Sequence, residues 1–260
     1  MGLKYVFLAT EGAHDQAAVG RLLKLLGLKE FEGEIKLLDP FWTPLIPTYP
    51  KGGKLYVRLD MPSIYTSSTH SVAIYQGSGS DLTKNLRAIM AAFPQYARDI
   101  DAFGLIVDAD TKQPDQVAKK YTQSLREFLP AISDVPGMVT STKPRTGIYV
   151  LPDNKQSGVL DSVLVSCASL VYPEHKAGAE KYLDGLSSVH KSHWRPFSKQ
   201  KALVASIVSV LRPGMANTPS IAQDNWFSEQ TINDIPEASM LKQFLETLLD
   251  LPISEDESAS

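Results

Sequence analysis

The chain is poor in cysteine and has no long hydrophobic segment. Of its 260 residues only Cys167 is a cysteine, which excludes a disulfide or a CxxC zinc site within one chain. Cys167 lies in an apolar run, where a lone thiol is expected to be a small buried hydrophobe. Every apolar stretch is shorter than ten residues, and the N-terminus lacks an apolar segment with a cleavage site. We therefore expect a cytoplasmic protein with no membrane span and no membrane partner.

The chain also lacks an excess of charge of either sign. It has 26 Lys and Arg against 29 Asp and Glu, and three of those acids (Glu255, Asp256 and Glu257) lie close to the C-terminus. The preceding residues therefore carry 26 basic and 26 acidic side chains. This balance excludes a strongly basic nucleic-acid-binding protein and still allows a local basic strip. With 43% hydrophobic residues, the composition is that of a globular protein with a substantial core.

Strand-like and helix-like segments alternate along the first part of the chain. Short apolar segments that predict strands lie at 5–9, 71–75, 103–107 and 147–151. Apolar residues at helical spacing lie at 15–26, 81–93 and 115–129. This order predicts an α/β fold, a Rossmann-like parallel sheet with flanking helices, whose functional residues lie at the carboxyl ends of the strands.

Two regions depart from this alternation. Residues 34–70 are rich in proline and aromatic residues, with a glycine turn at 51–54 and alternating polarity at 55–59, and predict an inserted hairpin-like segment. Helical patterns then fill the C-terminal part, at 157–171, 177–187, 197–211 and 236–249. We expect an α/β domain over 1–165, a helical region over 166–250 packed on it, and a disordered acidic tail over 251–260.

Carboxylates follow two of the predicted strands. Glu11 comes directly after the first strand, and a helix beginning near Ala13 would bring Asp15 to the same side as Glu11. Asp108 and Asp110 close the third strand, where extended geometry would point both to one face. Four carboxylates at one sheet edge repel each other and require a cation, and ligands that are all oxygen select Mg²⁺ or Mn²⁺. An Asp after a strand is also a common turn or cap residue, so the prediction depends on the two motifs occurring together.

These motifs resemble the Toprim domain of topoisomerases, bacterial primases and overcoming-lysogenization-defect (OLD) nucleases. The resembling residues are 11–15 and 107–110, and further similarity to stand-alone Toprim-like proteins related to the OLD nucleases covers 146–154, 157–161 and a later helix with Lys199 and Lys201. It extends over roughly residues 4–249 outside the insertion. The resemblance implies a Toprim-like fold in which Glu11, Asp108 and Asp110 bind Mg²⁺ and serve phosphoryl-transfer chemistry.

The resemblance also implies a second metal ion and a lysine. The position that matches the second-metal glutamate of the relatives is Asp161, one methylene shorter. We expect Glu11, Asp108 and Asp110 to hold one Mg²⁺ or Mn²⁺ ion, and Asp15 and Asp161 to place a second. The catalytic lysine is either Lys199 or Lys201, and Lys201 is preferred because it opens an amphipathic helix. The alternative is that Lys201 is an ordinary surface residue with no part in a reaction.

A basic and aromatic strip at 190–201 is the predicted contact with nucleic acid. Its candidate residues are Lys191, Trp194, Arg195 and Lys199, because cations beside aromatic rings suit phosphate contact and base stacking. The alternative is a solvated loop between two helices. Weaker candidates are Lys143, Arg145, Trp42, Tyr49, Lys51, Lys54 and Arg58. Gly77–Ser80 lacks a Walker motif and reads more simply as a turn with Ser80 or Asp81 as helix cap, so an ATPase would be a separate partner.

Three functions remain open at this stage. The first is a Toprim-type nuclease or phosphotransferase acting on DNA or RNA, in repair or phage defence. The second is a phosphohydrolase acting on a small nucleotide-like substrate, which the neutral charge tolerates better. The third is a non-catalytic regulatory module derived from Toprim that binds metal or nucleic acid. The sequence does not choose between DNA and RNA, or between monomer and dimer.

Overall fold

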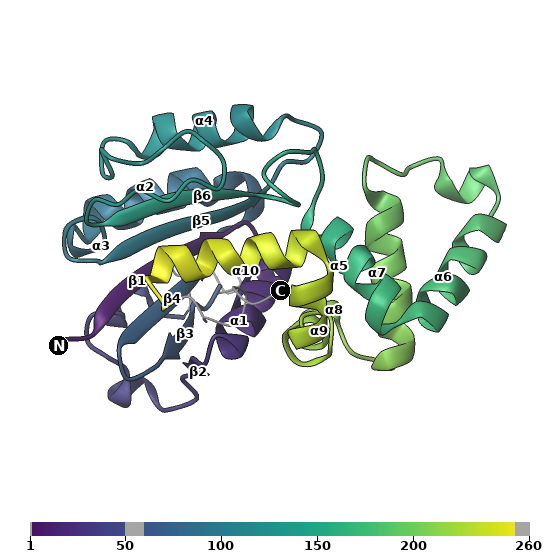
Figure 1. The fold of residues 1–260 in the computed structure, drawn as a ribbon, viewed down its shortest axis with the longest axis horizontal. Coiled ribbons are helices and arrows are strands. Elements are labelled where there is room, and N and C mark those ends of the chain that lie inside the picture. Colours follow the sequence, from purple (N-terminus) through teal and green to yellow (C-terminus); the bar gives the residue numbers. More distant parts are fainter. Residues whose placement is uncertain (1, 50–59, 253–260) are drawn as a thin grey trace, which may run out of the picture.

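The computed structural model describes residues 2–49 and 60–252, and these form an α/β structure around a six-stranded sheet (Figure 1). The strand order is β2-β3-β4-β1-β5-β6. Strand β1 pairs in parallel with β4 and β5, and β5 pairs in parallel with β6, whereas β3 is antiparallel to β2 and β4. The strands are β1 Lys4–Thr10, β2 Lys29–Glu30, β3 Ser63–Thr66, β4 His70–Gln76, β5 Ala102–Asp108 and β6 Arg145–Leu151. The predicted α/β class is confirmed, and the sheet is mostly parallel.

Ten α-helices lie within the described residues. They are α1 Ala13–Leu25, α2 Leu82–Ala92, α3 Gln95–Arg98, α4 Pro114–Leu125, α5 Leu160–Val171, α6 Pro173–Gly185, α7 Ser198–Leu211, α8 Asn217–Gln223, α9 Glu229–Asp234 and α10 Pro236–Leu249. Every predicted helix is present, with ends shifted by a few residues. The sequence did not predict α3, α8 and α9, because helices of one or two turns are too short to show a periodic apolar pattern.

The sheet is covered on both faces. Adjacent residues of β1 point to opposite faces, and Phe7 and Leu8 are both fully buried because each lies in a different core. Helices α2, α3 and α4 cover the Phe7 face, whereas α1, α5 and α10 cover the Leu8 face. Burial on both faces explains why these strands are continuously apolar in the sequence.

Helix α10 lies unusually close to the sheet. A Cβ atom on Gly104 of β5 would clash with the side chain of Leu248, and one on Gly147 of β6 would lie 2.7 Å from Phe244. Glycine at these two neighbouring, paired positions therefore makes room for α10.

The inserted segment covers one face of the sheet. It contains two 3₁₀ helices, Ile35–Leu37 and Thr43–Leu45, and ends in β3, which forms an antiparallel pair with β4. Trp42 is fully buried, stacks on Tyr96, and donates from Nε1 to Ser71 Oγ at 2.8 Å. The interpretation of Trp42 as a nucleic-acid contact is therefore wrong. The alternating segment 55–59 and the candidates Lys51, Lys54 and Arg58 lie outside the described residues.

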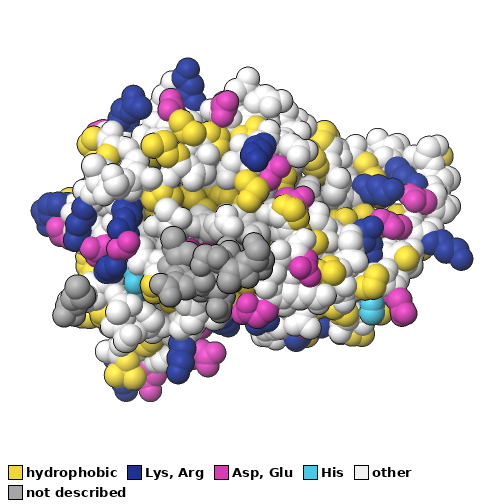
Figure 2. Space-filling view, in the orientation of Figure 1, with side chains coloured by type: hydrophobic (Ala, Val, Ile, Leu, Met, Phe, Trp, Pro, Cys, Tyr) yellow, Lys and Arg dark blue, Asp and Glu magenta, His cyan; other side chains and the backbone are white. Residues whose placement is uncertain are grey.

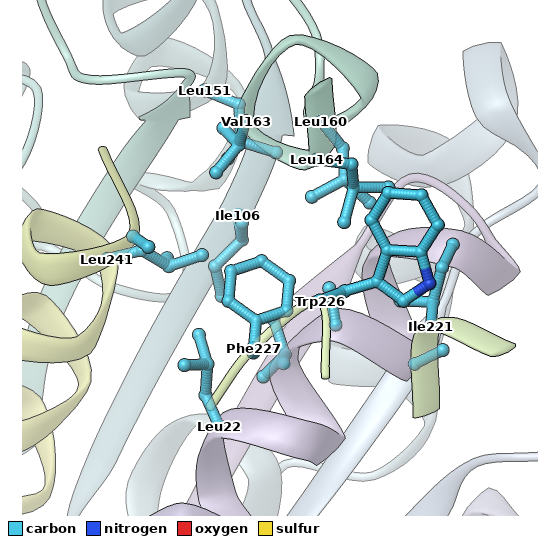
Figure 3. Close-up of a cluster of buried hydrophobic side chains, with 14 of the residues drawn as sticks. Leu22, Ile106, Leu151, Leu160, Val163, Leu164, Ile221, Trp226, Phe227 and Leu241 are labelled. Atoms are coloured by element: carbon cyan, nitrogen blue, oxygen red, sulfur yellow. The ribbon is translucent and has the colours of Figure 1, made fainter. Parts of the chain in front are cut away.

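An aromatic pair near the end of the chain joins the helical part to the sheet. Figure 3 shows Trp226 and Phe227 among apolar side chains from the sheet and from several helices, including Leu22 of α1 and Ile106 of β5. Trp226 Nε1 donates to Ser220 Oγ at 2.9 Å. Arg21 Nε donates to the carbonyl oxygen of Phe227 at 2.9 Å. The predicted domain boundary at residue 165 lies within α5 and remains a prediction.

Cys167 is buried in this core, as expected, and burial raises the pKa of its thiol to about 12.

Among the described helices, none has the length and apolar character needed to cross a membrane.

Truncation of Phe227 will test whether the two parts fold as one unit. Replacing Phe227 with Ala creates a cavity at a fully buried site and should lower the free energy of unfolding by about 3–5 kcal/mol in urea denaturation. The matched change Val189→Ala, at a side chain that is 75% exposed, should lie within about 0.5 kcal/mol of wild type. A loss below about 1 kcal/mol for Phe227→Ala would contradict cooperative docking.

Candidate active site

The site lies where the chain leaves the sheet in two directions. After β1 the chain turns into α1 on one face of the sheet, and after the neighbouring β5 it turns into α4 on the other face. Such a change of direction opens a crevice at the carboxyl ends of the two strands. Glu11 follows β1 and Asp108 is the last residue of β5, so both border this crevice.

Two cavities, each of about 250 Å³, lie at this edge of the sheet. We call them the first and second cavities, and Asp108 lines both. The first is lined by Gly12, Ala13, His14, Asp15, Asp108, Leu160, Asp161 and Lys201. The second is lined by Glu11, Gly79, Ser80, Asp108, Ala109, Asp110, Lys112, Val117, Lys120 and Tyr121. The five carboxylates predicted from the sequence therefore line two cavities that share Asp108.

Hydrogen bonds fix three of these carboxylates. Asp108 Oδ1 accepts from the backbone N–H of Leu160 at 2.8 Å, which ties the end of β5 to the start of α5. Asp15 Oδ2 accepts from the backbone N–H of Gly12 at 2.9 Å, and so satisfies an otherwise free donor at the start of α1. Glu11 Oε1 accepts from the Tyr121 hydroxyl at 3.0 Å. The side chains are thus held by the elements that surround the crevice.

The carboxylates are costly to ionise together. Burial, followed by repulsion from Glu11, raises the pKa of Asp15 from 3.8 to about 7. Burial, followed by repulsion from Asp15 and Glu11, raises the pKa of Asp108 well above its usual range. Burial is also the main reason why the pKa of Glu11 and that of Asp161 are raised. A cation bound among them would relieve both the repulsion and the loss of hydration.

Two details of the sequence-based geometry are wrong. The backbone does not stay extended after Asp108, because Asp110 has a φ of 51° and its N–H donates to the Gly158 carbonyl at 2.8 Å. Asp110 consequently lines only the second cavity. Glu11 and Asp15 line different cavities, since Gly12 between them is extended (φ −151°) and Glu11 lies outside α1. Glu11, Asp15 and Asp110 nevertheless all lie close enough to Asp108 to repel its charge.

The two candidate lysines occupy different environments. Lys201, in the first turn of α7, lines the first cavity beside Asp15 and Asp161. Lys199 forms an ion pair with Asp184 of α6, with 2.8 Å between Nζ and Oδ1, and is half exposed. Lys201 is therefore the lysine that shares a cavity with the carboxylates, whereas any role of either lysine in a reaction remains a prediction.

The other predicted nucleic-acid residues lie apart from the carboxylates. Trp194 packs partly against the core and has the Lys191 ammonium 6.0 Å from its ring centre, while Arg195 is exposed. Neither Trp194 nor its neighbours line the two cavities. Contact of this strip with nucleic acid remains a prediction.

Lys143 and Arg145 lie at the opposite edge of the sheet, where β6 begins. Lys143 pairs with Asp101 at 2.6 Å and Arg145 with Asp250 at 2.7 Å. On the face in Figure 2, basic and acidic side chains gather together at the end of the molecule where β1 begins. Lys143 and Arg145 therefore lie away from the carboxylates, and their contact with nucleic acid remains a prediction.

Four site residues were missed by the sequence reasoning: His14, Tyr121, Lys112 and Lys120. His14 lines the first cavity, where burial lowers the pKa of its imidazole and Asp161 opposes that effect. Position 14 was open to prediction, because it lies within the motif 11–15. Lys112, Lys120 and Tyr121 lie beyond the Asp108–Asp110 motif, and no spacing in the sequence marks the turn that brings them back to the crevice.

The donor set suits a hard divalent cation in its chemistry, because every predicted ligand is a carboxylate oxygen. In the described part of the chain, no three His, Cys, Asp or Glu side chains are already arranged around one point as a metal would require. Ion binding would consequently involve rotation of these side chains within the two cavities.

The chain matches one protein family and is similar in fold to a solved structure. A family model described as "Protein of unknown function (DUF3226)" matches residues 5–250. The crystal structure of hypothetical protein PH0156 from Pyrococcus horikoshii OT3 is similar over 95% of this chain and 98% of that chain, with 17% identity and a TM-score of 0.53. This likeness concerns the fold alone. The search of curated proteins gave no match.

Stability as a function of pH will test the crowding of carboxylates. An unfolded Asp has a pKa of about 3.9, whereas the pKa of Asp15 in the folded protein is about 7. Between these values the folded protein holds a proton that the unfolded chain has released. The contribution of Asp15 to stability is therefore complete below pH 4 and is lost as the pH rises to about 7.

Replacing Asp15 with Asn keeps an acceptor for the Gly12 N–H and removes the charge. At pH 8 with EDTA, urea denaturation should show Asp15→Asn to be about 2–4 kcal/mol more stable than wild type, and the difference should shrink by pH 4. Asp134→Asn, on an exposed loop, serves as control and should change stability by less than about 0.5 kcal/mol. A destabilised Asp15→Asn protein at pH 8 would contradict the argument.

Proposed function

We propose that this chain, which belongs to the DUF3226 family, is a Toprim-type enzyme that hydrolyses or transfers phosphodiesters in DNA or RNA with Mg²⁺ or Mn²⁺. The observation that carries the proposal is that four other carboxylates and Lys201 line the two cavities that share Asp108, at the carboxyl ends of β1 and β5. A cluster of buried acids with raised pKa values is a costly arrangement that is typical of functional sites. The site also lies where the chain leaves β1 and β5 toward opposite faces of the sheet, which is a common place for ligand binding in open α/β sheets.

Each side chain has a role that follows from its position. Glu11, Asp108 and Asp110 line the second cavity and would hold one ion, while Asp15 and Asp161 line the first and would help to hold another. Two bound ions supply an activated water and neutralise charge on the phosphoryl group. Tyr121 orients Glu11 through its hydroxyl, so that Glu11 is positioned to accept a proton from the attacking group. Lys201 stabilises the negative charge that develops on the phosphate.

The balanced charge of the chain favours a second candidate function. A chain without an excess of basic side chains suits a small phosphate-bearing compound better than a long nucleic acid. A phosphohydrolase acting on a small nucleotide-like compound would use the same carboxylates and would not require a basic track. Such an enzyme should show little dependence of substrate binding on salt, whereas a nuclease should show a strong one.

Removal of the central charge is the direct test. Asp108→Asn keeps an acceptor for the Leu160 N–H and should reduce Mg²⁺- or Mn²⁺-dependent cleavage of plasmid, single-stranded DNA or RNA by at least about a hundredfold. Circular dichroism should confirm an unchanged fold, and Asp134→Asn should retain full activity. Undiminished cleavage by Asp108→Asn would refute the assignment. Ion binding by wild type without turnover on any of the three would indicate the non-catalytic regulatory module.

A matched pair of lysine variants tests the role of Lys201. Lys201→Gln should lower kcat by about a hundredfold with little change in KM, because its charge is needed mainly in the transition state. Lys199→Gln removes a charge two residues away that pairs with Asp184, and should leave kcat within about twofold of wild type. Equal effects of the two changes would show that neither lysine has a specific role.

A further inference from the structure

We infer that the second cavity is a phosphate-binding pocket, in which Lys112 and Lys120 hold a phosphate group of the substrate beside Glu11, Asp108 and Asp110. The inference rests on the proposed function and deepens it, since it assigns the part of the site that recognises the substrate. The main electrostatic contact would then lie on α4 and the turn before it, rather than on the strip at 190–201.

The two lysines are the unpaired cations of this cavity. Both Lys112 and Lys120 line it, and among the described residues neither has an ion-pair partner within 4.0 Å. At the opposite edge of the sheet, by contrast, Lys4, Lys143 and Arg145 are all paired with carboxylates. Lys120 also lies over the ring of Tyr121, with 5.2 Å between Nζ and the ring centre. Cations that form no close ion pair and line one concave site are available to an anionic ligand.

The cavity has the dimensions of a phosphate site. Its volume of about 250 Å³ corresponds to about eight water molecules. This is enough for a phosphate group and part of its hydration, and too little for a base pair. Gly79 and Ser80 also line the cavity, and a serine hydroxyl is a neutral hydrogen-bond donor. A phosphate held here would lie next to Asp108, which borders both cavities.

The neighbouring acids impose a condition on binding. Glu11, Asp108 and Asp110 line the same cavity and would repel a phosphate unless a cation lies between. Binding of phosphate should accordingly require a divalent cation in the wild-type protein. A merely basic surface would bind phosphate without this requirement, so the dependence separates a built pocket from general attraction.

The test measures binding in the absence of cleavage. A fluorescent single strand of about 12 nucleotides is titrated with the full-length protein in Ca²⁺ in place of Mg²⁺ and followed by anisotropy, and inorganic phosphate with Mg²⁺ is titrated separately by calorimetry. Lys112→Gln and Lys120→Gln should each raise the dissociation constant for both probes by about tenfold. Each change should also reduce the slope of the logarithm of strand affinity against the logarithm of salt concentration by about one.

The control is Lys119→Gln, an exposed neighbour on α4 that does not line the cavity, and it should stay within about twofold of wild type. Three results would each overturn the pocket. The first is an equal loss of binding for Lys119→Gln and Lys120→Gln. The others are unchanged binding by a variant that carries both Lys112→Gln and Lys120→Gln, and wild-type binding without a divalent cation. Lysine-dependent binding of inorganic phosphate, with no binding of the strand, would support it and assign it to small phosphorylated compounds.

The outcome can be separated from that of the proposed function. If Asp108→Asn abolishes cleavage while the two lysine variants bind and cleave as wild type does, the enzyme assignment stands and the pocket fails. If no substrate is cleaved but phosphate binding needs Lys112, Lys120 and a divalent cation, the pocket stands and the nuclease fails.

Discussion

The crowding of buried carboxylates around Asp108 is the constraint on which the site depends. Two unit charges about 4 Å apart repel by roughly 4 kcal/mol at an effective dielectric constant of about 20. The fold tolerates this because Asp108 and Asp15 each accept a backbone hydrogen bond and because Lys201, Lys112 and Lys120 surround the cluster. The protein thus keeps an electrostatic strain at one edge of its sheet, where a cation can release it.

The topology of the sheet explains why the cluster has two sides. Strands β1 and β5 are parallel neighbours, but the segments that follow them turn to opposite faces. Asp108 closes the strand at this divide and is therefore exposed to both cavities. The first cavity is also lined by residues of α5 and α7 of the helical part, and the second by residues of α4. A substrate group on either side of Asp108 would meet a different lysine environment.

The sequence predicted the parts of the molecule that depend on local pattern. Continuous apolar segments identified β1, β4, β5 and β6, and the acids after β1 and β5 predicted where the site lies. It was less informative where long-range packing decides the conformation. The left-handed backbone of Asp110, the full burial of Trp42 and the return of Tyr121 to Glu11 arise from contacts between distant segments. The environments of Lys199 and Lys201 likewise depend on distant segments, since Lys199 pairs with Asp184 of another helix while Lys201 lines the first cavity.

The burial of Trp226 and Phe227 against α1 has a consequence for the order of assembly during synthesis. Helix α1 emerges from the ribosome early, whereas the aromatic pair that packs on it belongs to a late segment of the chain. Contacts between such distant segments close large loops and form slowly. Lys201 likewise lies far along the chain from Asp15 and Asp108, which line the same cavity. The nascent chain therefore contains these two carboxylates well before the lysine that lies beside them is synthesised.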